Sequence, residues 1–136
     1  MAMFSRSSSK AYPAFKRGPV SATDTSIKVC VRVRPFSRRE VEQGDRCCVS
    51  MSTRTEIELE DADGMRVFSF DRTYWSFESA STDYASQVTL MDELGNEQLE
   101  NVLNGYNACL FAYGQTGSGK TFSVLGSTSP PEMRGL

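Results

Sequence analysis

The chain has 136 residues and a formal net charge of −2 at pH 7; 39% of its residues are hydrophobic and 24% are charged. This length fits one domain at most, and the balanced charge gives no basic field of the kind that attracts nucleic acid. No apolar run is long enough to span a membrane, and the N-terminus lacks the apolar core of a secretory signal. Four cysteines without a CxxC pair, and no histidine, favour free thiols and a cytoplasmic location.

Residues 1–26 are predicted to form a flexible tail, because they are rich in serine, mildly basic and interrupted by Pro13 and Pro19. A solvated arm is the simplest interpretation, and binding to an acidic partner is the alternative. Ordered structure is predicted for residues 27–136.

Three alternating runs predict strands in the first half of this region. IKVCVRVRP predicts a strand that ends at Pro35, and SRREVEQGD follows as a short helical turn or loop. TEIELED and MRVFSFD flank DADG, which predicts a hairpin with Gly64 in its turn. The apolar face of the first strand would carry Ile27, Val29, Val31 and Val33.

Residues 81–105 have apolar side chains at helical spacing. Ser81 or Thr82 is suited to cap the start of this helix, and Gly105 to follow its end. The spacing slips near Gly95, so two helices or one kinked helix fit the pattern. The apolar positions are Val88, Met91, Leu94, Leu99, Val102 and Leu103.

The run ACLFAY, residues 108–113, is continuously apolar and of strand length. It predicts a strand that is buried on both faces in a parallel sheet, and KTFSVL predicts the start of a helix after it. Together these patterns indicate an α/β fold.

Between this strand and this helix, GQTGSGKT matches G-x-x-x-x-G-K-[ST] in full. Glycine lets several backbone N–H groups turn toward one anion; Lys120 would reach the β- and γ-phosphates, and the Thr121 hydroxyl would coordinate Mg²⁺. A glycine-rich turn with an incidental lysine is the alternative. The predicted nucleotide-binding residues are Gly114, Gln115, Thr116, Gly117, Ser118, Gly119, Lys120 and Thr121.

The motif alone does not separate GTPases, small-molecule kinases, helicases and motors, but three longer strings do. VCVRVRPF, FSFDRTYW and NVLNGYNACLFAYGQTGSGKTFSVLG stand in this order along the chain. In these strings the chain resembles the kinesin motor domain, over about residues 26–136. DRTYWSF, with DYASQ downstream, is most similar to the third, vesicle-transport class of kinesins.

The resemblance implies a P-loop NTPase fold of the kinesin-motor type, limited to its N-terminal strands, the P-loop and the start of the next helix. It implies ATP and Mg²⁺ as cofactors, a microtubule as partner and a cytoskeletal location, and it leaves direction of movement, cargo and oligomeric state open. A polar strand face and ordinary helix packing are the alternatives for the residues that it places near the adenine. Those residues are Arg32, Arg34, Pro35 and Phe122.

Neither the switch I string of kinesins, N-x-x-S-S-R, nor the switch II string, D-x-x-G, follows the P-loop here, and Glu132 is the one carboxylate after Thr121. We therefore expect no catalytic residue within this chain, and interpret it as the ATP-binding part of a motor truncated before the switch regions. A non-enzymatic nucleotide-binding or interaction fragment is the alternative. A nucleotide kinase has no reason to carry the R-x-R-P and F-x-F-D strings.

Overall fold

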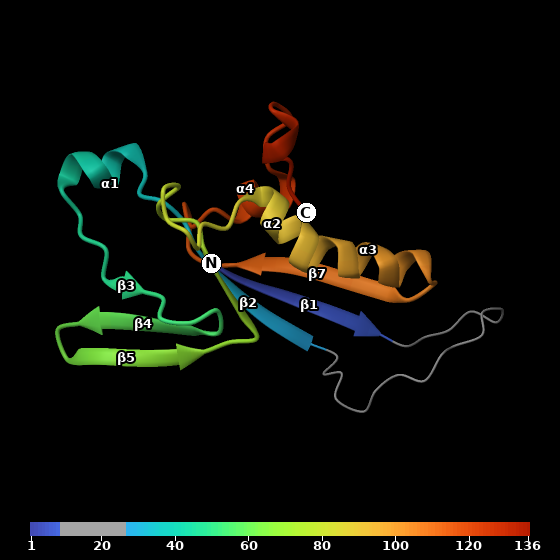
Figure 1. Cartoon of the computed structure of the whole chain (residues 1–136), viewed down its shortest axis with the longest axis horizontal. Coiled ribbons are helices and arrows are strands. Elements are labelled where there is room, and N and C mark those ends of the chain that lie inside the picture. Colours follow the sequence, from blue (N-terminus) through green and yellow to red (C-terminus); the bar gives the residue numbers. More distant parts are fainter. Residues whose placement is uncertain (9–26) are drawn as a thin grey trace.

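The computed structural model describes residues 1–8 and 27–136, whose arrangement is drawn in Figure 1. The elements, in chain order, are β1 (Ala2–Ser8), β2 (Ile27–Val33), α1 (Arg38–Gln43), β3 (Val49–Ser50), β4 (Glu56–Asp61), β5 (Gly64–Ser69), β6 (Arg72–Trp75), α2 (Gln87–Leu90), a π-helical turn (Met91–Gly95), α3 (Asn96–Leu103), β7 (Asn107–Tyr113), α4 (Lys120–Leu125) and a 3-10 turn (Pro131–Met133). The main sheet has the order β6-β2-β1-β7, and a smaller one the order β3-β4-β5. No helix in these two ranges has the length and apolar content to cross a membrane.

β1 departs from the predicted tail, because its backbone lies inside the main sheet. Ala2 pairs with Val31 of β2 and with Tyr113 of β7, and both pairings are antiparallel. β2 and β7 therefore run parallel to each other, as β2 and β6 also do. β1 fits between them because it supplies hydrogen-bond partners to two strands whose facing backbone groups need them. The remainder of the predicted tail, residues 9–26, lies outside the described residues.

The predicted hairpin and the short helix before it are both present. β4 pairs antiparallel with β5, and Gly64 adopts a φ of +119° at the turn. Ser37 and Glu40 form a reciprocal capping box at the start of α1, and Gly44 ends that helix with a φ of +70°. β6, which the sequence did not indicate as a strand, returns the chain from the hairpin to the main sheet beside β2.

The long helical segment begins later than predicted, because Ser86 caps it instead of Ser81 or Thr82. The Ser86 hydroxyl accepts a hydrogen bond from the backbone N–H of Thr89, whose own hydroxyl accepts one from the Ser86 N–H. At the other end Gly105 adopts a φ of +82° just after α3, which confirms the predicted glycine at the helix end.

The slip near Gly95 is a π-helical turn within a continuous helical segment. A side chain at Gly95 would overlap the sulfur of Met91, so glycine allows this close packing. The extra residue of the turn changes which face meets the sheet. Leu90 and Leu94 are buried, whereas four predicted core residues are exposed by 47% or more: Val88, Leu99, Val102 and Leu103.

Among the described residues, the core lies on one side of the main sheet. In Figure 1 the helices α2, α3 and α4 lie on the same side of that sheet. β7 correspondingly alternates between half-buried and exposed side chains, and Phe111 and Tyr113 are 52% and 70% exposed. The prediction that this strand is covered on both faces is therefore wrong for the described part of the chain. The buried core residues are Met3, Cys30, Tyr74, Ala85, Leu90 and Leu94.

Leu90 and Leu103 offer a direct test of this core. Leu90→Ala should lower the free energy of unfolding by about 2–5 kcal/mol, because it leaves a cavity under the sheet. Leu103→Ala should change it by less than about 0.5 kcal/mol, because that side chain is 77% exposed. Urea unfolding followed by circular dichroism measures both, and equal effects of the two substitutions would contradict the helix phase described above.

Candidate nucleotide-binding site

The P-loop follows β7 directly and ends in the first turn of α4, as predicted. Three of its residues have positive φ angles that favour glycine: Gly114 at +154°, Gly117 at +81° and Gly119 at +92°. At Gly114 a Cβ would also stand 2.5 Å from the Ser118 hydroxyl oxygen. The loop therefore requires glycine at these positions for its backbone shape, and at Gly114 for space as well.

Two polar groups in the loop fit an anionic ligand. The Lys120 ammonium donates to the carbonyl oxygens of Gly114 at 2.7 Å and Gln115 at 2.9 Å, so it already lies across the loop. The Ser118 hydroxyl is buried and has no hydrogen-bond partner among the described residues. A buried hydroxyl without a partner is costly unless a ligand or water reaches it. Thr121 follows in α4 and is exposed.

A cavity of about 180 Å³ adjoins the loop, and we call it the base-side cavity. It brings together all four residues that the resemblance places near the adenine, from β2, the chain after it and α4. It also contains residues that no sequence motif singles out. Its lining consists of Arg32, Arg34, Pro35, Ser76, Tyr84, Ser118, Gly119, Phe122, Ser123 and Met133.

Arg32 lies beneath this cavity and is 5% exposed, so the predicted face of β2 is reversed: Cys30 and Arg32 are buried and Ile27 is exposed. Neutral side chains satisfy the guanidinium. Its Nε donates to the Ser76 hydroxyl at 2.8 Å, and its Nη1 donates to the Ser123 hydroxyl at 2.9 Å and to the Gln87 amide oxygen. Burial lowers the pKa of Arg32. These contacts give Arg32 a structural role in the fold, and its predicted place near the adenine stays a prediction.

Phe122 and Gln87 extend this network into α4. The Arg32 guanidinium carbon lies 5.5 Å from the centre of the Phe122 ring, a cation–π contact. The Gln87 amide nitrogen donates to the Phe122 carbonyl at 2.8 Å and to the Arg134 carbonyl at 3.2 Å. Phe122 remains 40% exposed, so part of its ring is open to the cavity.

Arg34 is held at the cavity by an ion pair. Its two terminal nitrogens donate to the two carboxylate oxygens of Glu40 at 2.7 and 2.6 Å. Glu40 belongs to the capping box of α1, so the pair ties that helix to the end of β2. The hydrogen bonds from Arg34, and then those from Ser37, lower the pKa of Glu40 to about 2.

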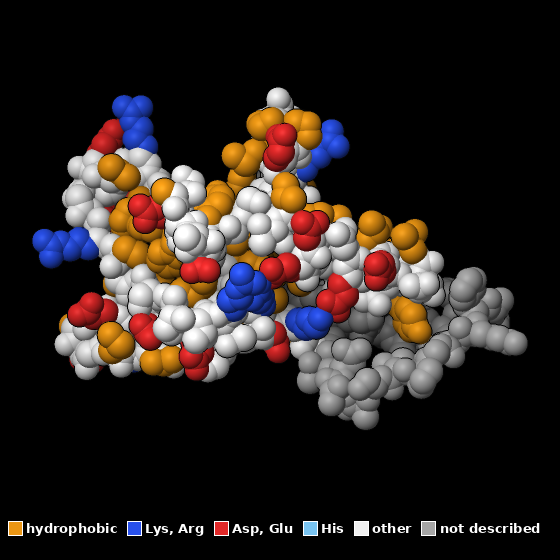
Figure 2. Space-filling view, in the orientation of Figure 1, with side chains coloured by type: hydrophobic (Ala, Val, Ile, Leu, Met, Phe, Trp, Pro, Cys, Tyr) orange, Lys and Arg blue, Asp and Glu red, His pale blue; other side chains and the backbone are white. Residues whose placement is uncertain are grey.

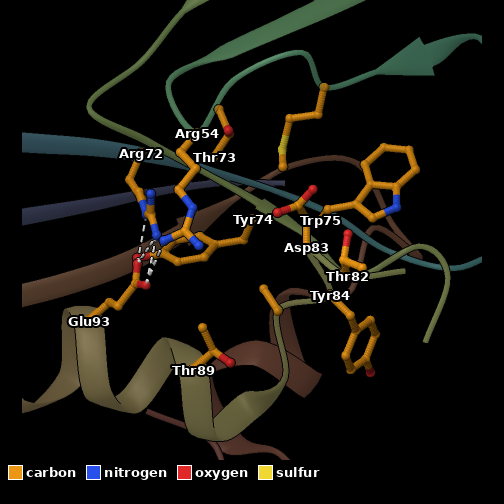
Figure 3. Close-up of a pocket in the computed structure, with 12 residues that line it drawn as sticks. Arg54, Arg72, Thr73, Tyr74, Trp75, Thr82, Asp83, Tyr84, Thr89 and Glu93 are labelled. Carbon is orange, nitrogen blue, oxygen red and sulfur yellow. Dashed lines mark hydrogen bonds and ion pairs between the residues drawn. The ribbon is translucent and has the colours of Figure 1, made fainter. Parts of the chain in front are cut away.

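Two further cavities border the same region. One of about 310 Å³ contacts the loop at Gln115 and Ser118, and lies where Figure 2 shows hydrophobic side chains gathered between α1 and the β4–β5 hairpin. The other, of about 70 Å³, is drawn in Figure 3. There the Glu93 carboxylate pairs with Arg72 at 2.6 Å and with Arg54 at 3.9 Å. No cluster of metal-ligating His, Cys, Asp or Glu side chains occurs within residues 1–8 and 27–136.

The Arg34–Glu40 pair predicts how Glu40 titrates. Its folded pKa lies below the ordinary value, so the stability it contributes is present above about pH 4.5 and is lost as the pH falls toward 2. A carbon-detected NMR titration should find a midpoint near 2. Arg34→Gln should return that midpoint toward the ordinary value, whereas Arg38→Gln, which removes an exposed pair with Glu42, should not. An ordinary midpoint in the unsubstituted chain would contradict the ion pair.

Comparison with known proteins gives the chain its family. The family model for the kinesin motor domain matches residues 32–136. The chain is 39% identical to the kinesin-like protein unc-104 of Caenorhabditis elegans, over 82% of this chain and 7% of that protein, and 44% identical to KIF13A of Homo sapiens, over 76% and 6%. A structure of KIF14 with ADP in complex with a microtubule matches with a TM-score of 0.69 at 38% identity, over 79% of this chain and 29% of that one.

The family-model match covers in full two of the strings on which the resemblance was based, and the first string from Arg32 onward. The chain spans less than a tenth of the length of unc-104 and KIF13A. The α/β fold of kinesin-motor type and the similarity to the third, vesicle-transport class, both predicted from the sequence, are confirmed. This chain belongs to the kinesin motor domain family.

Proposed function

We propose that this chain is the ATP-binding part of a microtubule-based motor. The observation that carries the proposal is the continuity between the P-loop and the base-side cavity, since Ser118 and Gly119 belong to both. A nucleoside triphosphate needs an anion cradle and, next to it, a cavity for a planar base. The glycine-rich loop has the character of the anion cradle, and the cavity between β2 and α4 has the character of the base site.

The roles of the loop residues follow from their present contacts. Lys120 would exchange the carbonyls of Gly114 and Gln115 for β- and γ-phosphate oxygens, because an ammonium binds an anion more strongly than a neutral acceptor. The loop N–H groups and the unpartnered Ser118 hydroxyl would donate to the phosphates. Thr121 would place its hydroxyl on Mg²⁺, which when bound supplies positive charge at the phosphates.

The base would occupy the cavity between Pro35 on one side and Phe122 on the other, with Arg34 at its edge. Backbone N–H groups bind phosphate and do not distinguish one base from another. Base preference therefore depends on these side chains. Rings and guanidinium planes stack on any base, which supports a modest preference for ATP over other triphosphates.

We assign binding, and not hydrolysis, to these residues. Lys120 and the loop hydroxyls are groups that bind phosphate, whereas phosphoryl transfer also requires an oriented water. The microtubule partner, and with it a cytoplasmic, cytoskeletal location, is proposed from family membership and from relatives such as KIF14, whose structure was solved on a microtubule.

Lys120→Ala should weaken MgATP binding about 100-fold or more, because the phosphates lose the loop's only ammonium. Thr121→Ala should lower affinity in the presence of Mg²⁺ while sparing most of the metal-free affinity. Titration with a fluorescent ATP analogue, with and without Mg²⁺, measures both.

Lys28→Ala is the matched control for the lysine substitution. Lys28 lies on β2 and pairs with Glu97 of α3 at 2.6 Å, away from the loop. The Lys28→Ala variant should bind MgATP as tightly as the unsubstituted chain does. Unchanged affinity in Lys120→Ala, or an equal loss in Lys28→Ala, would contradict the proposed site.

A further inference from the structure

Two adjacent thiols, Cys47 and Cys48, line the cavity of about 310 Å³ that borders the P-loop, which we call the thiol-lined cavity. Both cysteines are free and exposed. A cavity of this volume is large enough for a small organic ligand. Much of its remaining lining is hydrophobic: Val31, Val33, Phe36, Val49, Ile57 and Phe77.

The segment that carries these thiols is held against the hairpin. The Cys48 carbonyl accepts a hydrogen bond from the Glu60 N–H of β4 at 2.9 Å, and β3 begins with the next residue, Val49. The Cys47 thiol donates to the Val49 carbonyl at 3.2 Å. The Cys48 thiol has no hydrogen-bond partner within residues 1–8 and 27–136, so its sulfur is the freer of the two to react.

These two cysteines are poorly placed to oxidise each other. The Cα atoms of consecutive residues are about 3.8 Å apart, whereas Cα atoms joined by a disulfide are usually about 4.4–6.8 Å apart. Cys30 is buried, and burial raises the pKa of its thiol to about 11. Cys109 lies on β7 and is not part of the cavity lining. A disulfide at Cys48 therefore needs a thiol from outside the chain.

The charged side chains around the thiol-lined cavity favour an anionic partner. The guanidinium groups of Arg32, Arg34 and Arg46 line it, against the single carboxylate of Glu40. Arg34 is paired with Glu40, and neutral groups bind Arg32. Arg46 has no ion pair with a described residue and directly precedes the two thiols in sequence. Its guanidinium is therefore available to a carboxylate of a ligand attached beside it.

We propose that Cys48 is a modification site, which forms a mixed disulfide with a small thiol compound that carries carboxylates. The Cys48 thiolate attacks one sulfur of the disulfide form of that compound. A new S–S bond forms as the old one breaks, and the other half leaves as a thiolate. The proton of the Cys48 thiol passes to water, and the incoming disulfide is the only oxidant that the exchange needs.

The modification acts on the P-loop, because Gln115 and Ser118 line the same cavity. An anionic adduct there takes up space against the loop and places negative charge beside groups that are proposed to bind phosphates. The modified chain should therefore bind MgATP more weakly. This consequence rests on the proposed function, whereas the disulfide exchange at Cys48 does not.

The first experiment measures how fast each cysteine reacts with oxidised glutathione, an anionic disulfide, and with cystamine, a cationic one, by peptide mass spectrometry. The ratio of the two rates at Cys48, divided by the same ratio in the urea-unfolded chain, should be about ten in favour of glutathione. Arg46→Gln should lower this preference several-fold. Arg38→Gln, which changes an exposed arginine outside the cavity lining, is the matched control and should leave the preference unchanged.

Three outcomes would overturn the modification site. They are the absence of a glutathione preference at Cys48, an equal loss of that preference in Arg46→Gln and Arg38→Gln, and reaction of Cys47 in place of Cys48.

The second experiment measures MgATP affinity by calorimetry before and after treatment with oxidised glutathione. The affinity should fall about ten-fold on modification and return when dithiothreitol removes the adduct. Cys48→Ser, treated in the same way, should keep its affinity. Unchanged affinity in the fully modified chain would refute the effect on the loop. Failure of the unmodified chain to bind MgATP would refute the proposed function and leave the result at Cys48 intact.

Discussion

The site depends on one buried charge, the guanidinium of Arg32. Among the described residues no carboxylate pairs with it, so neutral oxygens and one aromatic ring must compensate its lost hydration. Those partners come from the end of β6, from α2 and from α4. A buried cation without its acceptors is strongly unfavourable, so the three elements are held near β2 by the same requirement. Gln87 extends the constraint to Phe122 and Arg134 through its amide nitrogen.

This constraint also positions the P-loop. α4 has six residues, too few to be stable by itself, and its contacts with Arg32 through Ser123 and Phe122 fix where it begins. The Ser123 N–H donates to the Gly119 carbonyl at 2.9 Å, so the last glycine of the loop is tied to the same residue. Phosphate loop and base-side cavity therefore form on two sides of one short helix, and neither is independent of the buried arginine.

The sequence predicted the features that local rules control. Fixed spacing and glycine chemistry predicted the P-loop, the hairpin turn at Gly64 and the glycine after α3, because each depends on backbone geometry within a few residues. The alternation of apolar and polar residues showed that β2 has two different faces, but it could not tell which face the helices cover. The acceptors that bind the buried Arg32 guanidinium lie 44 to 91 residues away in sequence. β1, the π-helical turn and the place of Tyr84 likewise depend on distant neighbours, which a single sequence does not display.

The position of the loop on the sheet would link binding of the proposed ligand to folding. Within residues 1–8 and 27–136, the loop follows a strand, β7, that stands at the end of the strand order and is covered by helices on one face. Fewer buried contacts per residue leave such a segment with low local stability. A ligand that binds only the ordered loop stabilises it by RT ln(1 + [L]/Kd), which is about 2.7 kcal/mol at a hundred times Kd. Phosphates bound by Lys120 and the Ser118 hydroxyl would add contacts at this edge of the sheet. Because α4 follows the loop, an ordered loop would also stabilise the hydrogen-bond network around Arg32.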